Sequence, residues 1–547
     1  MSSLLKRALV TLIVTGAIAT GVAREAASAG SYNDLVRLFA DWRAFERPPL
    51  RDGAPDYSAA TFKQRHAELA GYRKRLDAIK PGGWPVAQQV DYQLLRAEMN
   101  GFDFYVRVLK PWERDPAFYL LLWTAQSDTP AHEGPTNHAA IELWTYTFPL
   151  SPAAQEKLAQ ELRVIPPMLS QAKKNLTGNA RDLWNAGIGT LKQQEADLAA
   201  LETKTSSALP ALRKSITDAR AATADFVMWL EREAPSKTGS SGIGKDHYTW
   251  LLRHVYLIPL SWDDEVAILN RELARAHASL KFEEQRNRDL PPLTAISSPE
   301  EYQRRANDAV TRYIAFLEKK QMVPMHDYMD PALRAQMGEF VPEEKRNFFV
   351  IAEHYEPLTL YTHFYHWWDL AQMRETPHES PIRRGPLLYN IWDSRAEGMA
   401  TAMEEMMLHA GLFDDEPRAR EIIWIMLAQR AARGLASLHA HANEFTMSQA
   451  KEFQVAWTPR GWMRPDLDLL GFEQQLYLRQ PGYGTSYITG KYLIEQLMME
   501  RVKQLGEGFT TKRFFEEFNA AGLIPVSLIR WQLTGKDDAI RAIAGGQ

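Results

Sequence analysis

Apolar residues recur at spacings of three and four along almost the whole chain after residue 30. Near the start of this pattern, Leu35, Leu38, Phe39 and Trp42 fall on one side of a helix, as in an amphipathic α-helix. The same spacing predicts helices at 32–45, 60–79, 86–109, 151–232 (with breaks), 246–258, 261–284, 299–320, 358–373, 395–408, 421–442 and 488–505. The sequence therefore predicts an all-α fold, with 347–352 (NFFVIA) among the few segments typical of a strand.

The clearest interruption of the helical pattern is 235–245 (PSKTGSSGIGK), whose Gly and Ser residues are typical of a loop. It separates an N-terminal helical region, 30–234, from a C-terminal region, 246–547, and the two could also form one continuous body. The loop contains the G-x-x-x-x-G-K pattern of phosphate-binding loops. Asp246 follows it in place of a Mg²⁺-binding hydroxyl, and a helix rather than a strand precedes it, so we do not expect nucleotide binding.

The first residues have the pattern of an export signal. Lys6 and Arg7 precede an apolar run over 8–22, and Ala-Ser-Ala at 27–29 fits a cleavage site. The run is shorter than the about 20 residues that span a bilayer. We expect 1–29 to be a signal peptide, the mature chain to have no membrane span, and the protein to be periplasmic or secreted. An uncleaved anchoring helix is the alternative.

The amino-acid composition excludes several kinds of partner and of metal ligand. The 547 residues contain no cysteine and carry a formal net charge of -4, and no basic tract is present. Nucleic acid is therefore not an expected partner. Disulfides, thiolate ligands and acylation of a cysteine are excluded, so any metal site must use His, Asp, Glu or water.

Histidines and carboxylates gather at helical spacing between 354 and 409. His363 and His366 are three residues apart in a predicted helix, close enough to share a metal ion, although histidines that hydrogen-bond within a core are common. Glu397 and Glu404 are seven apart and share a face of the next helix. Buried glutamates require a metal, an arginine or a proton, so an ion pair with Arg383, Arg384 or Arg395 is the alternative to a metal.

Two later segments add candidate catalytic groups. Arg433 and His441 are eight apart on one helix face, where they could bind a carboxylate or an oxyanion; a salt bridge to Glu397 or Glu404 is the alternative. The glycine-marked turn 479–487 leads into the last long helix. Tyr483 or Tyr487 could donate a proton or a hydrogen bond there, although aromatic packing is the more ordinary role.

These segments resemble a bacterial family known as domain of unknown function 885, some of whose members look like helical zinc metallopeptidases of the gluzincin kind. EGMATAMEE at 397–405 is similar to the family's E-G-W-A-x-Y-A-E, and PGYGTSY at 481–487 to P-G-Q-A-x-S-Y. Arg433 and His441 match positions of a third motif. The resemblance implies a site at His363, Glu397 and His441. The family's H-E-x-x-P-G-H is replaced here by PLTLYTH, which ends at His363. The leading His-Glu pair is absent, and His354, Glu356 or His366 could substitute for it.

The residues and the resemblance together predict an exported, metal-dependent hydrolase of peptides or related amides. We expect Zn²⁺ at His363, His366 and Glu397, with Glu404 (or Glu356) as general base. His441 and Tyr487 would stabilise an oxyanion, and Arg433 would hold a carboxylate. The alternative is a non-catalytic periplasmic binding protein that keeps the pocket and has lost the metal chemistry, which the missing His-Glu pair favours.

Overall fold

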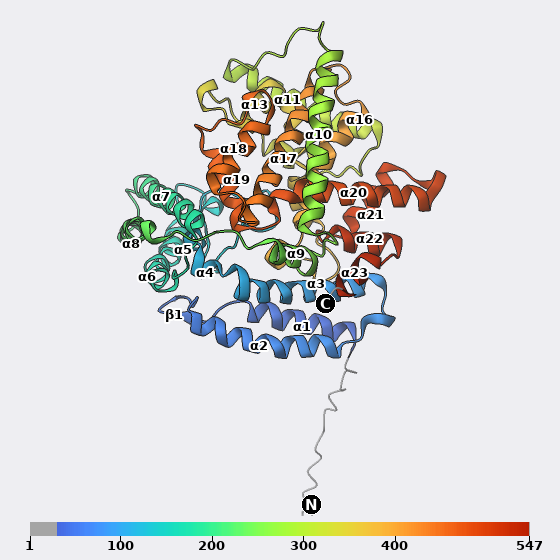
Figure 1. Ribbon diagram of the computed structural model, residues 1–547. Helices are drawn as coiled ribbons and strands as arrows, with labels where there is room; N and C mark the ends of the chain where they lie inside the picture. The colour runs from blue at the N-terminus through green and yellow to red at the C-terminus, as the bar shows by residue number, and fades with distance from the viewer. Residues whose placement is uncertain (1–29, 546–547) are drawn as a thin grey trace, which may run out of the picture.

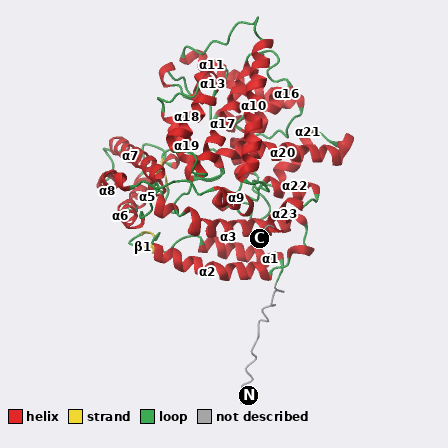
Figure 2. Ribbon diagram, in the orientation of Figure 1, coloured by secondary structure: helices red, strands yellow, loops and turns green. Residues whose placement is uncertain are grey.

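The computed structural model describes residues 30–545, and almost all regular structure in this range is helical (Figure 2). The prediction of an all-α fold is confirmed. Two very short strand pairs are the exceptions: β1 (Leu50–Arg51) pairs antiparallel with β2 (Ala54–Pro55), and β3 (Leu122–Trp123) pairs parallel with β4 (Ile141–Glu142). The predicted signal peptide, 1–29, lies outside the described residues.

Three long helices form a layer at one end of the molecule (Figure 1). They are α1 (Tyr32–Phe45), α2 (Ala59–Ala78) and α3 (Val86–Phe104). Ser31 and Asp34 cap the start of α1 reciprocally, which satisfies backbone N–H groups that a helix start otherwise leaves unpaired. Helix α3 continues as a π-turn at Tyr105–Leu109 before the short α4 (Pro111–Arg114).

The segment predicted as 151–232 forms four helices packed beside this layer (Figure 1). They are α5 (Pro152–Leu162), α6 (Ile165–Asn175), α7 (Arg181–Lys204) and α8 (Pro210–Glu233). Ser151 caps α5 by accepting a hydrogen bond from a backbone N–H, and Pro152 occupies its first turn, where proline fits best.

The rest of the chain forms a larger helical body around the apolar helix α17 (Figure 1). Its elements are α9 (Lys245–His254), α10 (Trp262–Arg286), α11 (Pro299–Lys320), α12 (Met329–Arg334), α13 (Phe348–Tyr355), α14 (Pro357–Tyr361), α15 (Tyr365–Glu375), α16 (Asp393–Ala410), α17 (Ala419–His441), α18 (Met447–Trp457), α19 (Asp468–Arg479), α20 (Tyr483–Leu505), α21 (Thr511–Ala520), α22 (Val526–Thr534) and α23 (Asp538–Gly545). Within residues 30–545, none of the helices has a stretch long and apolar enough to cross a bilayer.

Helices α16 and α20 pack backbone to backbone because each has a glycine at the contact. A Cβ atom placed on Gly398 would lie 2.5 Å from the Cα of Gly490, and one on Gly490 would lie 2.1 Å from the carbonyl oxygen of Ser394. No other residue type leaves this space. The close approach brings polar side chains at the start of α20 next to those of α16.

Two local predictions differ from the structure. The segment 347–352, expected as a strand, is part of α13; Asn347 caps this helix by accepting hydrogen bonds from two backbone N–H groups. The single helix predicted at 358–373 is split by a turn at 362–364 into α14 and α15. Thr362 stabilises the turn by donating its hydroxyl hydrogen to the Thr359 carbonyl at 2.8 Å. His363 therefore lies in a turn rather than on a helix face.

Buried ion pairs join 30–234 to 246–547. Arg383 donates to Asp91 at 2.6 Å, and Arg479 donates to Asp115 at 2.7 Å. Both pairs are almost completely buried, so each would leave an uncompensated charge if the contact opened.

Candidate metal centre

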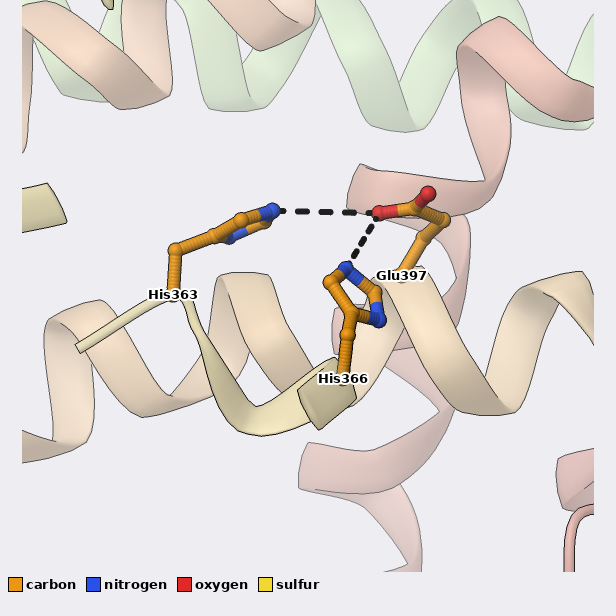
Figure 3. A group of neighbouring side chains, drawn as sticks. All are labelled: His363, His366 and Glu397. Carbon is orange, nitrogen blue, oxygen red and sulfur yellow. Dashed lines mark hydrogen bonds and ion pairs between the residues drawn. The ribbon is translucent and has the colours of Figure 1, made fainter. Parts of the chain in front are cut away.

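Three buried side chains converge: His366 from α15, Glu397 from α16 and His363 from the turn before α15 (Figure 3). The Nε2 atom of His366 lies 3.1 Å from Oε2 of Glu397, and Nε2 of His363 lies 3.8 Å from the same oxygen. All three candidate ligand atoms lie within 4.8 Å of one another. Ligands of a tetrahedral Zn²⁺ ion are about 3.4 Å apart, given bonds of about 2.1 Å. The three side chains therefore fit zinc with small adjustments.

Glu404 and Arg430 surround the far side of the His363 ring. Nδ1 of His363 lies 3.0 Å from Oε1 of Glu404 and 3.2 Å from a guanidinium nitrogen of Arg430. Glu404 and Arg430 are themselves ion-paired at 2.6 Å. When Nδ1 carries the proton it faces Glu404 and leaves Nε2 unprotonated for a metal; when Nε2 carries it, Nδ1 accepts from Arg430. The surroundings thus permit the tautomer that a metal ligand requires.

The two histidines have opposite protonation tendencies. Burial, Arg430 and His366 together hold the pKa of His363 well below its usual range. Burial opposes protonation of His366 as well, but the charges of Glu397 and Asp128 outweigh it and raise the pKa of His366 to about 9. Nδ1 of His366 is buried without a hydrogen-bond partner among the described residues. Without a metal, the centre is therefore an imidazolium–carboxylate pair beside a neutral imidazole.

Glu397 also receives a hydrogen bond from α20. The Tyr483 hydroxyl donates to Oε1 of Glu397 at 2.5 Å, and the Tyr487 hydroxyl donates to that of Tyr483 at 3.2 Å. Although burial opposes ionisation, His366 and Tyr483 hold the pKa of Glu397 below its usual value. Helix α20 starts after Gly482, whose φ of +90° suits glycine. The turn thus positions Tyr483 in the first turn of α20, one turn before Tyr487.

A loop between β3 and β4 contributes two carboxylates that the sequence analysis did not identify. Tyr483 contacts Glu133 at 3.3 Å. Burial and the charges of Asp128 and Glu397 raise the pKa of Glu133 to about 8, and burial also raises that of Asp128. This loop has no periodicity to guide a prediction; the signal it does carry is a His-Glu dipeptide at 132–133, followed by Gly134.

The remaining predicted residues have partners outside this group of candidate ligands. Arg433 pairs with Glu473 at 2.6 Å rather than with Glu397 or Glu404, and its guanidinium lies 3.9 Å from the centre of the Tyr487 ring. Nε2 of His441 lies 2.8 Å from the Tyr477 carbonyl oxygen. This hydrogen bond holds the His441 ring against the backbone of α19. Its catalytic role stays a prediction that this contact does not support.

The residues considered as substitutes for the missing His-Glu pair have other partners. His354 accepts a hydrogen bond from the Val341 N–H at 3.0 Å. Arg305 donates to Glu356 at 2.8 Å. Of the three candidates, His366 alone belongs to the ligand group.

The fold and this centre define a helical protein with two histidines and one glutamate gathered in its core. The chain belongs to the family described as bacterial protein of unknown function (DUF885), whose profile matches residues 43–533. The expected family membership is thus confirmed.

Two solved structures are similar to the chain over 93% of its length and 100% of theirs. One is described as a "putative lipoprotein of unknown function" from Shewanella oneidensis, with 15% identity and a TM-score of 0.70. The other is the "putative lipoprotein" from Colwellia psychrerythraea, with 14% identity and a TM-score of 0.62. At this identity the likeness shows the fold alone. No curated protein matched the chain significantly.

Proposed function

We propose that this protein is an exported, metal-dependent hydrolase of peptides or related amides, with Zn²⁺ held by His363, His366 and Glu397. The observation that carries the proposal is the convergence of three buried ligand atoms within 4.8 Å of one another. A zinc ion bound there would polarise a scissile carbonyl and lower the pKa of a bound water. The periplasmic or secreted location rests on the predicted signal peptide and is part of the proposal.

Two carboxylates could accept the proton of an attacking water. Glu404 is the residue that the sequence predicts for this role, but it is ion-paired with Arg430 and lies 3.0 Å from Nδ1 of His363. These contacts favour a role in orienting the histidine. Glu133 has no ion pair among the described residues and contacts Tyr483 beside Glu397. We therefore assign proton transfer to Glu133, whose carboxyl a Zn²⁺ ion bound nearby would favour in the ionised form, and orientation of His363 to Glu404.

The tyrosines of α20 are the best-placed hydrogen-bond donors to a developing oxyanion. Tyr487 stacks near the His363 ring, with ring centres 6.1 Å apart and planes 12° apart. The guanidinium of Arg433 covers the Tyr487 ring, so Arg433 would hold this tyrosine in place. Whether Arg433 also binds a substrate carboxylate stays a prediction.

One observation favours the alternative, a binding protein without metal chemistry. Both oxygens of Glu397 already have partners: Oε1 accepts from Tyr483, and Oε2 lies 3.1 Å from Nε2 of His366. A carboxylate whose two oxygens are satisfied in this way can keep its position without an ion.

The test is the metal content of the untagged mature protein, measured by plasma mass spectrometry after incubation with zinc and dialysis. His363→Ala removes a ligand, and His277→Ala, which replaces a partly exposed histidine on α10, is the matched control. We expect about one zinc per chain in the natural protein and in His277→Ala, and far less in His363→Ala. Zinc content that is the same in all three proteins, or absent from all, would contradict the metal site.

Activity is tested separately with a library of internally quenched peptides. We expect zinc-dependent cleavage that chelation abolishes and Glu133→Gln reduces by about 10²-fold or more, because general base catalysis contributes about 10²–10⁴-fold. Zinc binding without cleavage of any peptide would leave the metal site in place and refute the hydrolase. Cleavage that survives Glu133→Gln but not Glu404→Gln would return the base role to Glu404.

A further inference from the structure

A cavity of about 640 Å³ lies between the N-terminal layer and the 126–142 loop. Its walls come from α1, α2, the end of α3 with its π-turn, and α4, together with this loop and 386–390. Aromatic rings dominate the lining, among them Tyr57, Phe62, Phe102, Trp112 and Trp144. Charged side chains line it as well, namely Arg43, Arg65, Glu46 and Glu142. A concave site that combines aromatic walls with charged groups suits a small ligand that has a ring and a charge.

The unusual polar group of this cavity is Arg65. Arg65 is only 6% exposed, yet it is one of the residues that line the cavity. The guanidinium donates to the Phe45 carbonyl and lies 4.8 Å from the Phe45 ring centre and 5.4 Å from that of Phe102. No carboxylate within residues 30–545 forms an ion pair with it. An arginine this buried normally has an anionic partner, because an unpaired buried charge is costly.

The nearby carboxylates do not fill this role. Glu98 is ion-paired with Arg43 at 3.0 Å. Glu46 accepts a hydrogen bond from the Tyr389 hydroxyl at 2.8 Å, and burial raises the pKa of Glu46 to about 8. The charge of Arg65 favours ionisation of Glu46, but burial outweighs this attraction, and the two side chains form no ion pair.

The pKa of His138 also reflects the positive charge at the cavity. Its side chain is solvent-accessible and also lines the cavity. Enough protein surrounds the ring to lower the pKa of His138 to about 4, and the positive charges of Arg65, Arg47 and Arg43 are the next causes. The imidazole is thus neutral at pH 7, so the positive charge on this side of the cavity comes from arginines. Glu142, which also lines the cavity, lies 2.6 Å from His132.

We propose that this cavity binds a small aromatic carboxylic acid, with the carboxylate ion-paired to Arg65 and the ring packed against the aromatic walls. An arginine guanidinium matches a carboxylate in shape and charge, and the apolar body of the ligand replaces water on the rings. This site is distinct from the metal centre and does not depend on the hydrolase activity.

The loop that separates the two sites presents different residues to each. Ser127, Thr129 and His132 line the cavity. Asp128 and Glu133 are not among the lining residues, and Glu133 lies 3.3 Å from the Tyr483 hydroxyl, which donates to Glu397. One loop therefore contributes residues to both sites. A ligand in the cavity would contact the loop that also carries Glu133.

Calorimetry on the mature protein tests the proposal with 3-phenylpropionate as the probe. Its amide, 3-phenylpropanamide, has the same shape without the charge, acetate has the charge without the ring, and phenyl phosphate offers another oxyanion. We expect 3-phenylpropionate to bind at least about tenfold more tightly than the amide or acetate, since hydrogen bonds to charged groups contribute this much. Tighter binding of phenyl phosphate would overturn the choice of a carboxylate.

Three variants locate the binding. Arg65→Met keeps much of the side-chain volume, and we expect it to remove the preference for the acid over the amide. His138→Glu adds a negative charge on an accessible side chain, so it should keep the fold and weaken binding of the acid about tenfold. This variant tests the charge preference of the site if Arg65→Met does not fold. His363→Ala should bind the acid normally. Binding lost in His363→Ala, or equal for acid and amide, would refute the second site.

Discussion

Replacing Gly398 with alanine tests the contact that brings α20 to the metal centre. The new Cβ would lie 2.5 Å from the Cα and carbonyl carbon of Gly490, whereas ordinary contacts start at 3.4 Å. Both helices meet through backbone here, so no side-chain rotation relieves the overlap. The helices must separate by about 1 Å.

The size of the effect follows from two opposing terms. Overpacking a core costs about 1–3 kcal/mol, and a clash between backbones belongs at the upper end. Alanine in place of glycine stabilises a helix by about 1 kcal/mol. We expect a net loss of about 2 kcal/mol in the free energy of unfolding for Gly398→Ala. The Tyr483–Glu397 hydrogen bond, which spans the same contact, should lengthen, and zinc should bind more weakly.

Gly189→Ala is the matched control. Gly189 lies in the middle of α7, and a Cβ atom at this position would have no neighbour within 4 Å. The same substitution should therefore stabilise the protein by about 1 kcal/mol. Urea unfolding followed by circular dichroism measures both variants. Equal stability of the two variants would refute the argument that backbone contact, rather than helix propensity, governs Gly398.

Three further predictions each concern one side chain. Tyr483→Phe removes the hydrogen bond to Glu397 and should lower zinc affinity about tenfold in a competition assay with a chromophoric chelator; unchanged affinity would count against the bond. Glu473→Ala leaves Arg433 buried without its carboxylate and should cost about 3–5 kcal/mol in urea unfolding; a loss below about 1 kcal/mol would contradict this. Burial raises the pKa of Glu46 from 4.5 to about 8, so the folded state keeps a proton that the unfolded chain releases. Stability should fall as pH rises from 4.5 to 8, by about 1.4 kcal/mol per unit, and Glu46→Gln should remove this part of the fall; identical pH profiles would refute it.

The helices were predictable because their apolar spacing is a local property. The predicted 299–320 and 32–45 coincide with α11 and α1, and 395–408 lies within α16. Apolar faces at this spacing must be buried against one another, so the all-α class followed from the sequence. Interruptions of a helix were harder to predict. The pattern at 358–373 is that of one helix, but Thr359 and Thr362 donate hydrogen bonds to nearby carbonyls and stabilise a turn there.

The candidate metal centre was predictable in part for a similar reason. His366 and Glu397 stand out as polar groups within apolar helices, and His363 was found although the helix assumed for it is a turn. The partners of these residues were not predictable. Arg433 faces Glu473, forty residues away along the chain, and not the glutamates considered for it.

The sequence by itself determined the helical class, the family and the three candidate ligands, because periodicity, motifs and ligand chemistry are written in residues near one another. The tertiary structure alone decided that Glu133 reaches Tyr483 and that Arg65 lines a cavity without forming an ion pair. Both depend on loops and helices from distant parts of the chain meeting in space. Burial then sets which charges are compensated, and burial is a property of the packed whole.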